Sequence, residues 1–374
     1  MQWQPESGER VAVPVYMGAY VDDITIVAPM SLMKGLFDEL AVEFTFRDPP
    51  EPLTRLLGIR YVTKTGSRGE RILEFDQEEF ALHLVHDFEK GCAKLPRAIT
   101  PALSETPPKP ETEWLEEKGL YADAAPHWVG RLLYLSRGSR GDICYAVVRL
   151  TRAVHRWTKR EDQDLMRLVA FLKYKPGVIV MYRGSWEELP CLADSIFPQV
   201  VIHHMADADH AGDRLTRRST SGYVTIATLE DAFPDSTHGK AHTLIDWGAK
   251  GQKAAAWSTG EAELGALNCG LRRSGIPSWM LFEHLTNQAG RATLRAYGDA
   301  QACGGAVQKG ASPAMRYVQK TQGVRISWLH DVLMLNPTVT LQDIRTFLML
   351  ADMFTKALEQ KPMELICGAL GLRV

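Results

Sequence analysis

Four acidic residues in the second half of the chain are of the type that binds divalent metal ions. They are Asp207, Glu263, Asp299 and Asp352. Carboxylate oxygens are the hard ligands that Mg²⁺ prefers. Two such ions about 4 Å apart can activate a water and stabilise the leaving oxygen when a phosphodiester is hydrolysed. The chain has 45 acidic residues, and most acids are solvated surface groups, so residue type alone does not define a site.

The sequence around these residues predicts strands and helices that meet at one edge of a sheet. VVIHHMADADHAG is typical of a strand that ends in carboxylates, and TLRAYGDAQA of a strand that ends at Asp299. STSGYVTIAT predicts a turn followed by a strand, VTLQDIRT a strand or a strand-to-helix turn, and LADMFTKAL a closing helix. Because carboxylates at strand ends and in first helical turns lie along one sheet edge, we expect them to converge.

A helix is expected to present Glu263 from its first turns. Ser258 can cap a helix that starts near Glu261, and the positive end of the helix dipole stabilises a nearby carboxylate. Asp209 and Glu261 lie two residues from Asp207 and Glu263 and are alternative metal ligands. The competing interpretation is that both are solvated neighbours of the site.

The chain before residue 200 predicts further parts with different patterns. VAVPVYMGAYVDDITIVAP predicts two short strands joined by a tight turn at Asp22 and Asp23, LLGIRYV another strand, and DQEEFALHLVHDF an amphipathic helix. ITPALSETPPKPETEW is rich in proline and polar residues and predicts a linker. Two amphipathic helices and the strand VIVMY follow. The predicted boundaries are 1–95, 96–126 (the linker), 127–199 (a connection region), 200–358 and 359–374 (a C-terminal tail).

Composition places the chain among ordinary globular proteins. Of its 374 residues, 45% are hydrophobic and 24% are charged, and the formal net charge is −2. Contact with a polyanion would therefore depend on local basic patches. The six cysteines include no C-x-x-C pair, which argues against a zinc site and favours a reducing compartment. The N-terminus lacks the pattern of a signal peptide, so secretion is not expected.

Four strings in the second half resemble one known family. MADADHAGDRLTRRSTSGYV, IDWGAKGQKAAAWSTGEAELGAL, AYGDAQA and LADMFTKAL occur in the order found in ribonuclease H domains of copia-type retrotransposon Pol polyproteins. The family's strings are similar to D-A-D-W-A-G-D, S-T-E-A-E-Y, D-N-x-x-A and A-D-x-x-T-K-x-L. The resemblance covers most of Met205 to Leu358 and implies a mixed sheet with flanking helices that binds two Mg²⁺ ions, with Mn²⁺ as an alternative.

The resemblance also implies a role for each acid. Asp207 and Asp299 would bind one or both metals, Glu263 would hold the ion near the leaving oxygen, and Asp352 would complete the shell of the water-activating ion. The products would end in a 3′-hydroxyl and a 5′-phosphate. Gly222 is expected to form part of the turn in STSGYVTIAT and to have no catalytic role. Four basic residues in the matching strings either contact phosphate or form an ordinary exposed basic face. They are Arg217, Arg218, Lys250 and Lys253.

The sequence departs from the family pattern in three places. LEDAFPDSTHGKAHTL, between Thr228 and Ile245, is an extra segment whose composition predicts a surface loop. KTQGVRIS has Thr321 and Ser327 where histidines are usual, and His330 is displaced from those positions. ASPAM replaces the usual polar loop after the third acid. Because a histidine there could assist proton transfer, its absence bears on the reaction rate more than on the fold.

The first block resembles the end of a reverse transcriptase. Y-V-D-D, with Asp22 and Asp23, is similar to the Y-x-D-D turn, and LLGIRY, DQEEFALHLVHDF and AITPAL are similar to strings that follow it in copia-type polymerases. GRLLYLSRGSRGDICYAVVRLTR continues the likeness, with Gly141 in place of the usual proline. Only nineteen residues precede Tyr20, which leaves no room for a further catalytic aspartate and the fingers. We therefore expect a truncated palm and thumb remnant that does not polymerise DNA alone.

These observations predict an α/β protein, α+β in its N-terminal remnant, that contains a ribonuclease H-like domain. The expected function is a retroelement-derived endonuclease, a metal-dependent hydrolase that cleaves the RNA strand of RNA·DNA hybrids. The alternative is a catalytically inactive, nucleic-acid-binding relic of a copia-type retrotransposon; a subunit that completes its polymerase with another chain is a weaker reading. The expected partners are the hybrid and other retroelement polyprotein products, without a membrane, in a cytoplasmic particle or the nucleus.

Overall fold

The structure is a computed structural model of the chain. It describes residues 2–3, 11–12, 15–66, 69, 71–91, 94–103, 117–184, 200–213, 216–229, 242–285, 292–311 and 320–373. The extra segment predicted as a surface loop, the ASPAM string and most of the proline-rich linker fall largely outside these residues. No helix in the described part of the chain has the length and apolar character needed to cross a membrane.

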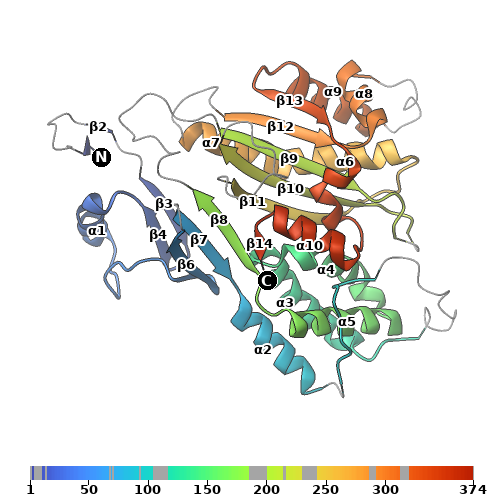
Figure 1. Ribbon diagram of the computed structural model, residues 1–374, viewed down its shortest axis with the longest axis horizontal. Helices are drawn as coiled ribbons and strands as arrows, with labels where there is room; N and C mark the ends of the chain where they lie inside the picture. The colour runs from blue at the N-terminus through green and yellow to red at the C-terminus, as the bar shows by residue number, and fades with distance from the viewer. Residues whose placement is uncertain are drawn as a thin grey trace.

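A ten-stranded mixed sheet forms the centre of the molecule (Figure 1). β9 and β12 are parallel neighbours, as are β12 and β13, whereas every other neighbouring pair in this sheet is antiparallel. In spatial order the strands are β13 (Val339–Asp343), β12 (Ala292–Gly298), β9 (Val200–Ala208), β10 (Thr220–Leu229), β11 (His242–Gly251), β8 (Ile179–Gly184), β7 (Arg71–Asp76), β6 (Ile59–Thr65) and β5 (Arg55–Leu56), with β14 (Leu372–Arg373) also paired to β8.

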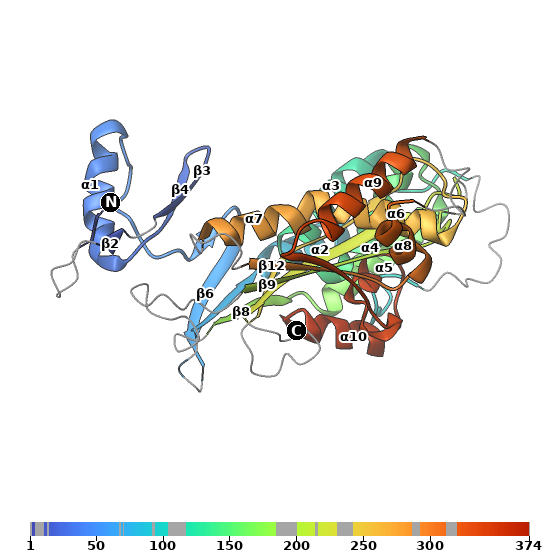
Figure 2. The ribbon, with the colours of Figure 1, turned by 90° about the horizontal axis from the view of Figure 1, so that it is seen from above.

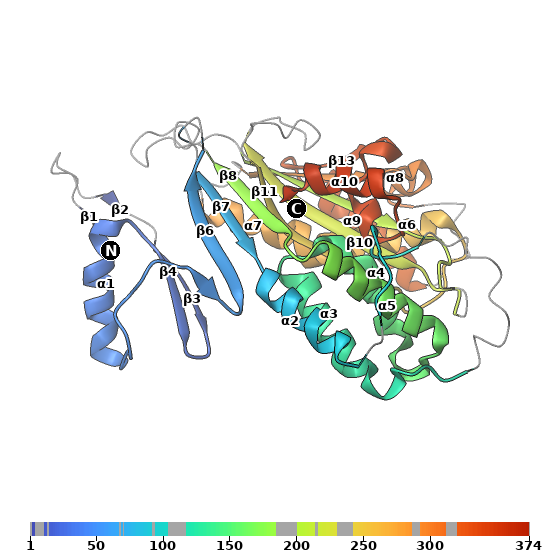
Figure 3. The same cartoon turned by 60° about the horizontal axis from the view of Figure 1, so that its bottom comes forward.

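Helices cover both faces of this sheet, and each face has its own apolar core (Figure 3). One core joins inward-facing side chains of β9, β10 and β12 to a first set of helices. These are α6 (Thr259–Gly270), α7 (Ile276–Leu285), α8 (Gln301–Lys309) and α9 (Lys320–Met334). The other core joins Met205, Val224 and Trp247 to a second set. These are α2 (Glu78–Glu89), α3 (Ala125–Gly138), α4 (Cys144–Ala153), α5 (Lys159–Tyr174) and α10 (Gln360–Ala369).

The N-terminal hairpin lies apart from these layers. β3 (Tyr16–Tyr20) and β4 (Asp23–Val27) form a two-stranded sheet, and α1 (Met30–Glu43) follows with no buried residue. Figure 2 shows this unit at one end of the molecule, beside β6. Two further short strands, β1 (Gln2–Trp3) and β2 (Val11–Ala12), pair with each other. The hairpin prediction is confirmed, with Val21 and Asp22 rather than the two aspartates in the turn.

Most predicted elements form where the sequence indicated, with two exceptions. The closing helix predicted for LADMFTKAL is wrong: Leu350–Phe354 is a short 3₁₀ helix, and the α-helix α10 begins only at Gln360. The C-terminal tail therefore contains both a helix and β14. LLGIRYV is also more than one strand, because Leu57 and Gly58 form a turn with positive φ between β5 and β6.

The predicted α/β class is confirmed, and the ribonuclease H-like arrangement stays a prediction. The domain boundaries also stay predictions. The sheet takes strands from four of the five predicted segments: β5, β6 and β7 come from residues 1–95, β8 from 127–199, β9 to β13 from 200–358 and β14 from 359–374. The strands from outside residues 200–358 extend the same sheet that carries the predicted acidic site.

Candidate metal centre

Asp207 comes from an interior strand of the sheet, close to where the strand ends. It lies in β9 opposite Gly222 of β10, and its side chain is buried. Gly222 has a packing role here, since a Cβ at this position would lie 2.6 Å from Thr355 Cγ2 and 2.8 Å from Phe354 Cβ. The missing side chain lets the segment that carries Asp352 pack directly against β10, next to Asp207 on the neighbouring strand.

Glu263 comes from the first turns of α6, whose start is fixed by a capping arrangement. Ser258 Oγ accepts a hydrogen bond from the Glu261 backbone N–H at 3.2 Å, and Glu261 Oε2 accepts one from the Trp257 N–H at 2.8 Å. This confirms the predicted cap and gives Glu261 a local structural partner. Glu263, two residues further on, is buried and faces Asp207.

Asp299 follows β12 directly and is half-buried. Thr346 Oγ1 donates a hydrogen bond to its Oδ2 at 3.3 Å. Because β12 is the parallel neighbour of β9, the carboxyl end of β12 brings Asp299 to the same sheet edge as Asp207.

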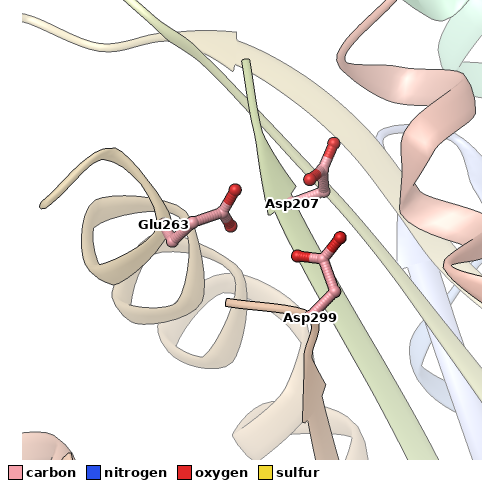
Figure 4. Close-up of side chains that lie close together, drawn as sticks. All are labelled: Asp207, Glu263 and Asp299. Carbon is pink, nitrogen blue, oxygen red and sulfur yellow. The ribbon is translucent and has the colours of Figure 1, made fainter. Parts of the chain in front are cut away.

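These three carboxylates converge. One oxygen from each of Asp207, Glu263 and Asp299 lies within 4.8 Å of the other two, and Figure 4 shows the three side chains pointing toward a common space. Among the described residues, this is the only group of three or more potential metal-ligating side chains that meets in this way. The group matches three of the four acids predicted from the sequence.

Asp352 lies beside this group but outside its common space. Its carboxyl group interacts with that of Asp207, which raises the pKa of Asp352, and Thr355 Oγ1 donates a hydrogen bond to Asp207 Oδ2. Lys356 Nζ lies 2.9 Å from Asp352 Oδ1. Sequence reasoning did not assign a role to Thr355 or Lys356, although both lie in the string LADMFTKAL. The i, i+4 spacing of Asp352 and Lys356 could have indicated this ion pair.

The proximity of these acids alters their protonation. Burial, followed by the charges of Asp207 and Asp299, raises the pKa of Glu263 to about 9. Burial and Asp207 raise the pKa of Asp352 to about 7, although Lys356 opposes this. Burial and Asp207 also raise the pKa of Asp299. Like charges crowded in a buried place resist ionisation, and a bound cation would relieve that cost.

The two alternative ligands have other roles. Asp209 Oδ2 accepts a hydrogen bond from Thr220 Oγ1 at 2.8 Å, and its Oδ1 accepts from the Thr220 backbone N–H. Asp209 therefore fixes the start of β10, as Glu261 fixes the start of α6. Neither belongs to the group of converging carboxylates.

The predicted basic residues occupy two places. Arg217 and Arg218 are exposed in the turn that follows β9, where Arg217 adopts a positive φ of 54°. Lys250 and Lys253 are exposed along a groove that also has three arginines, which sequence reasoning missed. They are Arg272, Arg273 and Arg325.

Two remaining sets of candidates lie away from the carboxylates. Asp22 and Asp23 are exposed at the tip of the β3–β4 hairpin, and neither belongs to a group of converging ligands within the described residues. His330 donates from Nδ1 to the Val307 carbonyl of α8 at 2.9 Å. The histidine is thus held by α8.

Comparison with known proteins relates the chain to transposon proteins. It is 30% identical over 254 residues, 67% of its length, to a retrovirus-related Pol polyprotein from transposon RE1 of Arabidopsis thaliana. It is 27% identical over 246 residues, 65% of its length, to one from transposon TNT 1-94 of Nicotiana tabacum. An uncharacterized mitochondrial protein of Arabidopsis thaliana is 27% identical over 261 residues, which cover 68% of this chain and 90% of that protein. No protein-family model matches the chain.

The chain spans only 14% and 16% of the two Pol polyproteins that it matches. The predicted relationship to copia-type retrotransposon Pol polyproteins is confirmed by 27–30% identity over about two thirds of the chain. The assignment of individual domains and activities within such a polyprotein stays a prediction.

Proposed function

We propose that this chain is a retroelement-derived, metal-dependent ribonuclease H that cleaves the RNA strand of RNA·DNA hybrids. The observation that carries the proposal is the convergence of Asp207, Glu263 and Asp299 at one sheet edge, with ligand oxygens within 4.8 Å of one another. The similarity to transposon Pol polyproteins supports the choice of a nucleic-acid substrate.

The donor set fits Mg²⁺. All three groups supply carboxylate oxygens, which suit a hard cation, and two of the three are buried, where uncompensated negative charge is unfavourable. Asp207, Glu263 and Asp299 would hold metal, and Asp352, through its contact with Asp207, would complete the ligand set for a second ion. Bound Mg²⁺ would supply Lewis-acid stabilisation of the phosphoryl oxygens and would lower the pKa of the attacking water.

The protein's own groups set the charge of the site. The raised pKa of Glu263 and of Asp352 means that protons and metal compete for the same carboxylates near neutral pH. Lys356 offsets part of the negative charge from one side of the site. Thr355 fixes the orientation of the Asp207 carboxylate by donating to Oδ2, which leaves Oδ1 for metal.

The same chain is not proposed to polymerise DNA. Asp22 and Asp23 are exposed on a hairpin without a third acidic partner among the described residues. A primer-extension assay with template, nucleotides and Mg²⁺ tests this. Robust extension would overturn it.

The experiment for the main proposal is Mg²⁺-dependent cleavage of a labelled RNA·DNA hybrid by the wild type and by Asp207→Asn. Asp331→Asn removes an exposed carboxylate of α9 and is the matched control. We expect cleavage by the wild type and the control, and loss of at least 100-fold in Asp207→Asn, on the scale of a lost catalytic group. Absence of wild-type cleavage at every Mg²⁺ and Mn²⁺ concentration would leave the inactive nucleic-acid-binding relic.

A further inference from the structure

A basic groove lies along α6 on a different side from the carboxylates. Its lining comes from the end of β11, the segment that leads into α6, and the helical residues Gly265, Asn268 and Cys269. Its volume is about 500 Å³. Glu263 does not line it, whereas Glu261 does, so α6 separates the groove from the metal centre.

The groove has a strong excess of positive charge. Five cationic side chains line it, against one acid, Glu261, which is already hydrogen-bonded to the Trp257 N–H. The cations are Lys250, Lys253, Arg272, Arg273 and Arg325. Within the described part of the chain, no carboxylate forms an ion pair with either lysine, Arg272 or Arg273. In a chain with a net charge of −2, such a concentration of cations is a local feature that suits a polyanion.

The local helix geometry places two arginines that are neighbours in the sequence on the exposed side of the helix. After Gly270 the helix continues as one π-helical segment, Leu271–Gly275, before α7 begins. Leu271, Ser274 and Gly275 of that segment are buried, and Arg272 and Arg273 are exposed. The π-helical segments of proteins are frequently found at functional sites.

An exposed tryptophan directly follows a segment that lines the groove. Trp257 follows Ala256, which lines the groove, and its side chain is 91% exposed. A large aromatic side chain left in water has no role in the core, and it presents a face on which a nucleobase can stack. Bases within a duplex are already stacked on their neighbours, so only unpaired bases can use this face.

We propose that the groove binds a single-stranded segment of nucleic acid, with Arg272, Arg273 and the lysines on the phosphates and Trp257 stacked on a base. Grooves with cations along the backbone and aromatic side chains for the bases are the usual means of single-strand binding. The phosphates of a duplex could contact the cationic side chains, but its paired bases could not stack on Trp257. The groove is a binding site in its own right and does not depend on the metal centre being active.

The test is equilibrium binding of a 5′-labelled single-stranded 12-mer, as DNA and as RNA, to the full chain by fluorescence anisotropy in EDTA. Arg272→Gln/Arg273→Gln should weaken binding at least tenfold, and it should reduce the salt-dependence slope by about 1.4, because about 0.7 is lost per phosphate contact of a single strand. Lys34→Gln/Lys361→Gln removes the same charge from exposed positions outside the groove and should leave the affinity unchanged.

The tryptophan is tested separately. Trp257→Ala should weaken single-strand binding by about 5- to 150-fold, the range for loss of one base-stacking contact, and Trp257→Phe should restore most of it. Neither should change the affinity for a blunt RNA·DNA hybrid. Wild-type affinity in the double arginine variant, or equal effects of Trp257→Ala on single strand and blunt hybrid, would overturn the proposal.

The two proposals fail in different ways. If Asp207→Asn abolishes cleavage and binds the 12-mer normally, while the groove variants lose the 12-mer, both stand. If the wild type does not cleave but the groove variants still lose the 12-mer, only the ribonuclease proposal fails. Tighter binding of the DNA or of the RNA 12-mer identifies which strand the groove takes.

Discussion

Glu263 and Asp352 are carboxyl groups whose protonation is linked to both folding and metal binding. Each has a raised pKa because it lies in a protein interior beside Asp207. A raised carboxyl pKa means that the folded protein binds a proton that the unfolded chain releases. In the absence of metal, the folded state must therefore retain protons or accept repulsion between these groups.

This linkage predicts a stability that falls with rising pH. Folded Glu263 keeps its proton up to about pH 9, whereas the unfolded chain loses it near the ordinary value of 4.5. Between these values the free energy of unfolding of the metal-free protein should decrease, by up to about 1.4 kcal/mol per pH unit for one group. Urea unfolding in EDTA from pH 5 to 9 measures this. Glu263→Gln should flatten the dependence and the exposed Glu359→Gln should not; equal slopes in all three proteins would contradict it.

Lys356 supplies a second prediction for the same site. Its ammonium group lies against Asp352 and also lowers the pKa of Glu263 and Asp299. Lys356→Gln should therefore lower the melting temperature of the metal-free protein near pH 8 and increase the stabilisation that Mg²⁺ provides, because the metal then faces a more negative site. Differential scanning fluorimetry with and without Mg²⁺ checks both. If Mg²⁺ raises the melting temperature of the variant and of the wild type equally, Lys356 does not alter the electrostatic potential at the carboxylates.

At the scale of single residues, the sequence predicted the three acids that converge. Asp207, Glu263 and Asp299 each lie within a string with a recognisable order, and each follows or opens an element whose pattern was clear. The groove arginines were not predicted, because the elements that line the groove are brought close only by packing. Lys356 was also missed, although its i, i+4 spacing from Asp352 is a local signal. Asp209 and Glu261 could not be separated from the metal ligands before their capping hydrogen bonds were known.

The helix α6 is the element on which both proposed sites depend. It presents Glu263 to the metal centre and Gly265, Asn268 and Cys269 to the basic groove. Its close approach to the sheet requires glycine at its end. A Cβ at Gly270 would lie 2.6 Å from His204 Nε2 and 2.9 Å from Tyr223 Cβ, and both of these side chains are buried.

This contact gives a prediction with an internal control. Gly270→Ala should destabilise the protein by about 1–3 kcal/mol, the range for overpacking a core. Gly305→Ala, in the interior of α8, meets no atom within 4 Å and should instead stabilise the protein by about 0.5–1 kcal/mol. Chemical denaturation measures both. The same sign for the two substitutions would mean that the close approach of α6 to the sheet is not the determining factor.

Elements were easier to predict than their ends. The apolar periodicities of α2, α4 and α5 gave the buried faces found in the structure, because burial of one side of a helix leaves that pattern in the sequence. The string LADMFTKAL has the same periodicity, but Leu350–Phe354 forms a 3₁₀ helix that packs against β10 where Gly222 has no side chain. That contact is between residues far apart in sequence, which periodicity cannot show.

At the scale of the whole molecule, the sheet joins the segments that the sequence pattern divided. β7 pairs with β8, and Trp247 of β11 donates from Nε1 to the Ser136 carbonyl of α3 at 2.9 Å. Arg137 of α3 donates to the Trp247 carbonyl at 2.7 Å. The helices before residue 200 thus form one face of the core beneath the acidic site. Strand pairings over such sequence separations leave no local signal, so the shared sheet could not be predicted.

The shared sheet predicts that residues 200–374 are not stable alone. Without the preceding segment, the buried Trp247 would face water and β11 would become an exposed edge. The fragment should melt well below the full chain or aggregate, whereas the full chain should lose its sheet in one transition. Circular dichroism during heating tests this. A fragment that melts at the temperature of the full chain would support the predicted boundary at residue 200 as a domain boundary.

The small strand β14 has a consequence for the order of events during synthesis. β8 is bordered by β7 along one side, and along the other by β14 at Ile179 and Val180 and by β11 only at Arg183. Leu372 and Arg373 therefore fill the stretch of β8 that β11 does not reach. On the ribosome, this stretch remains open to other chains until Leu372 and Arg373 have been translated and have left the exit tunnel. Neighbouring nascent chains on the same polysome are therefore the chains with which β8 could form a wrong strand pairing.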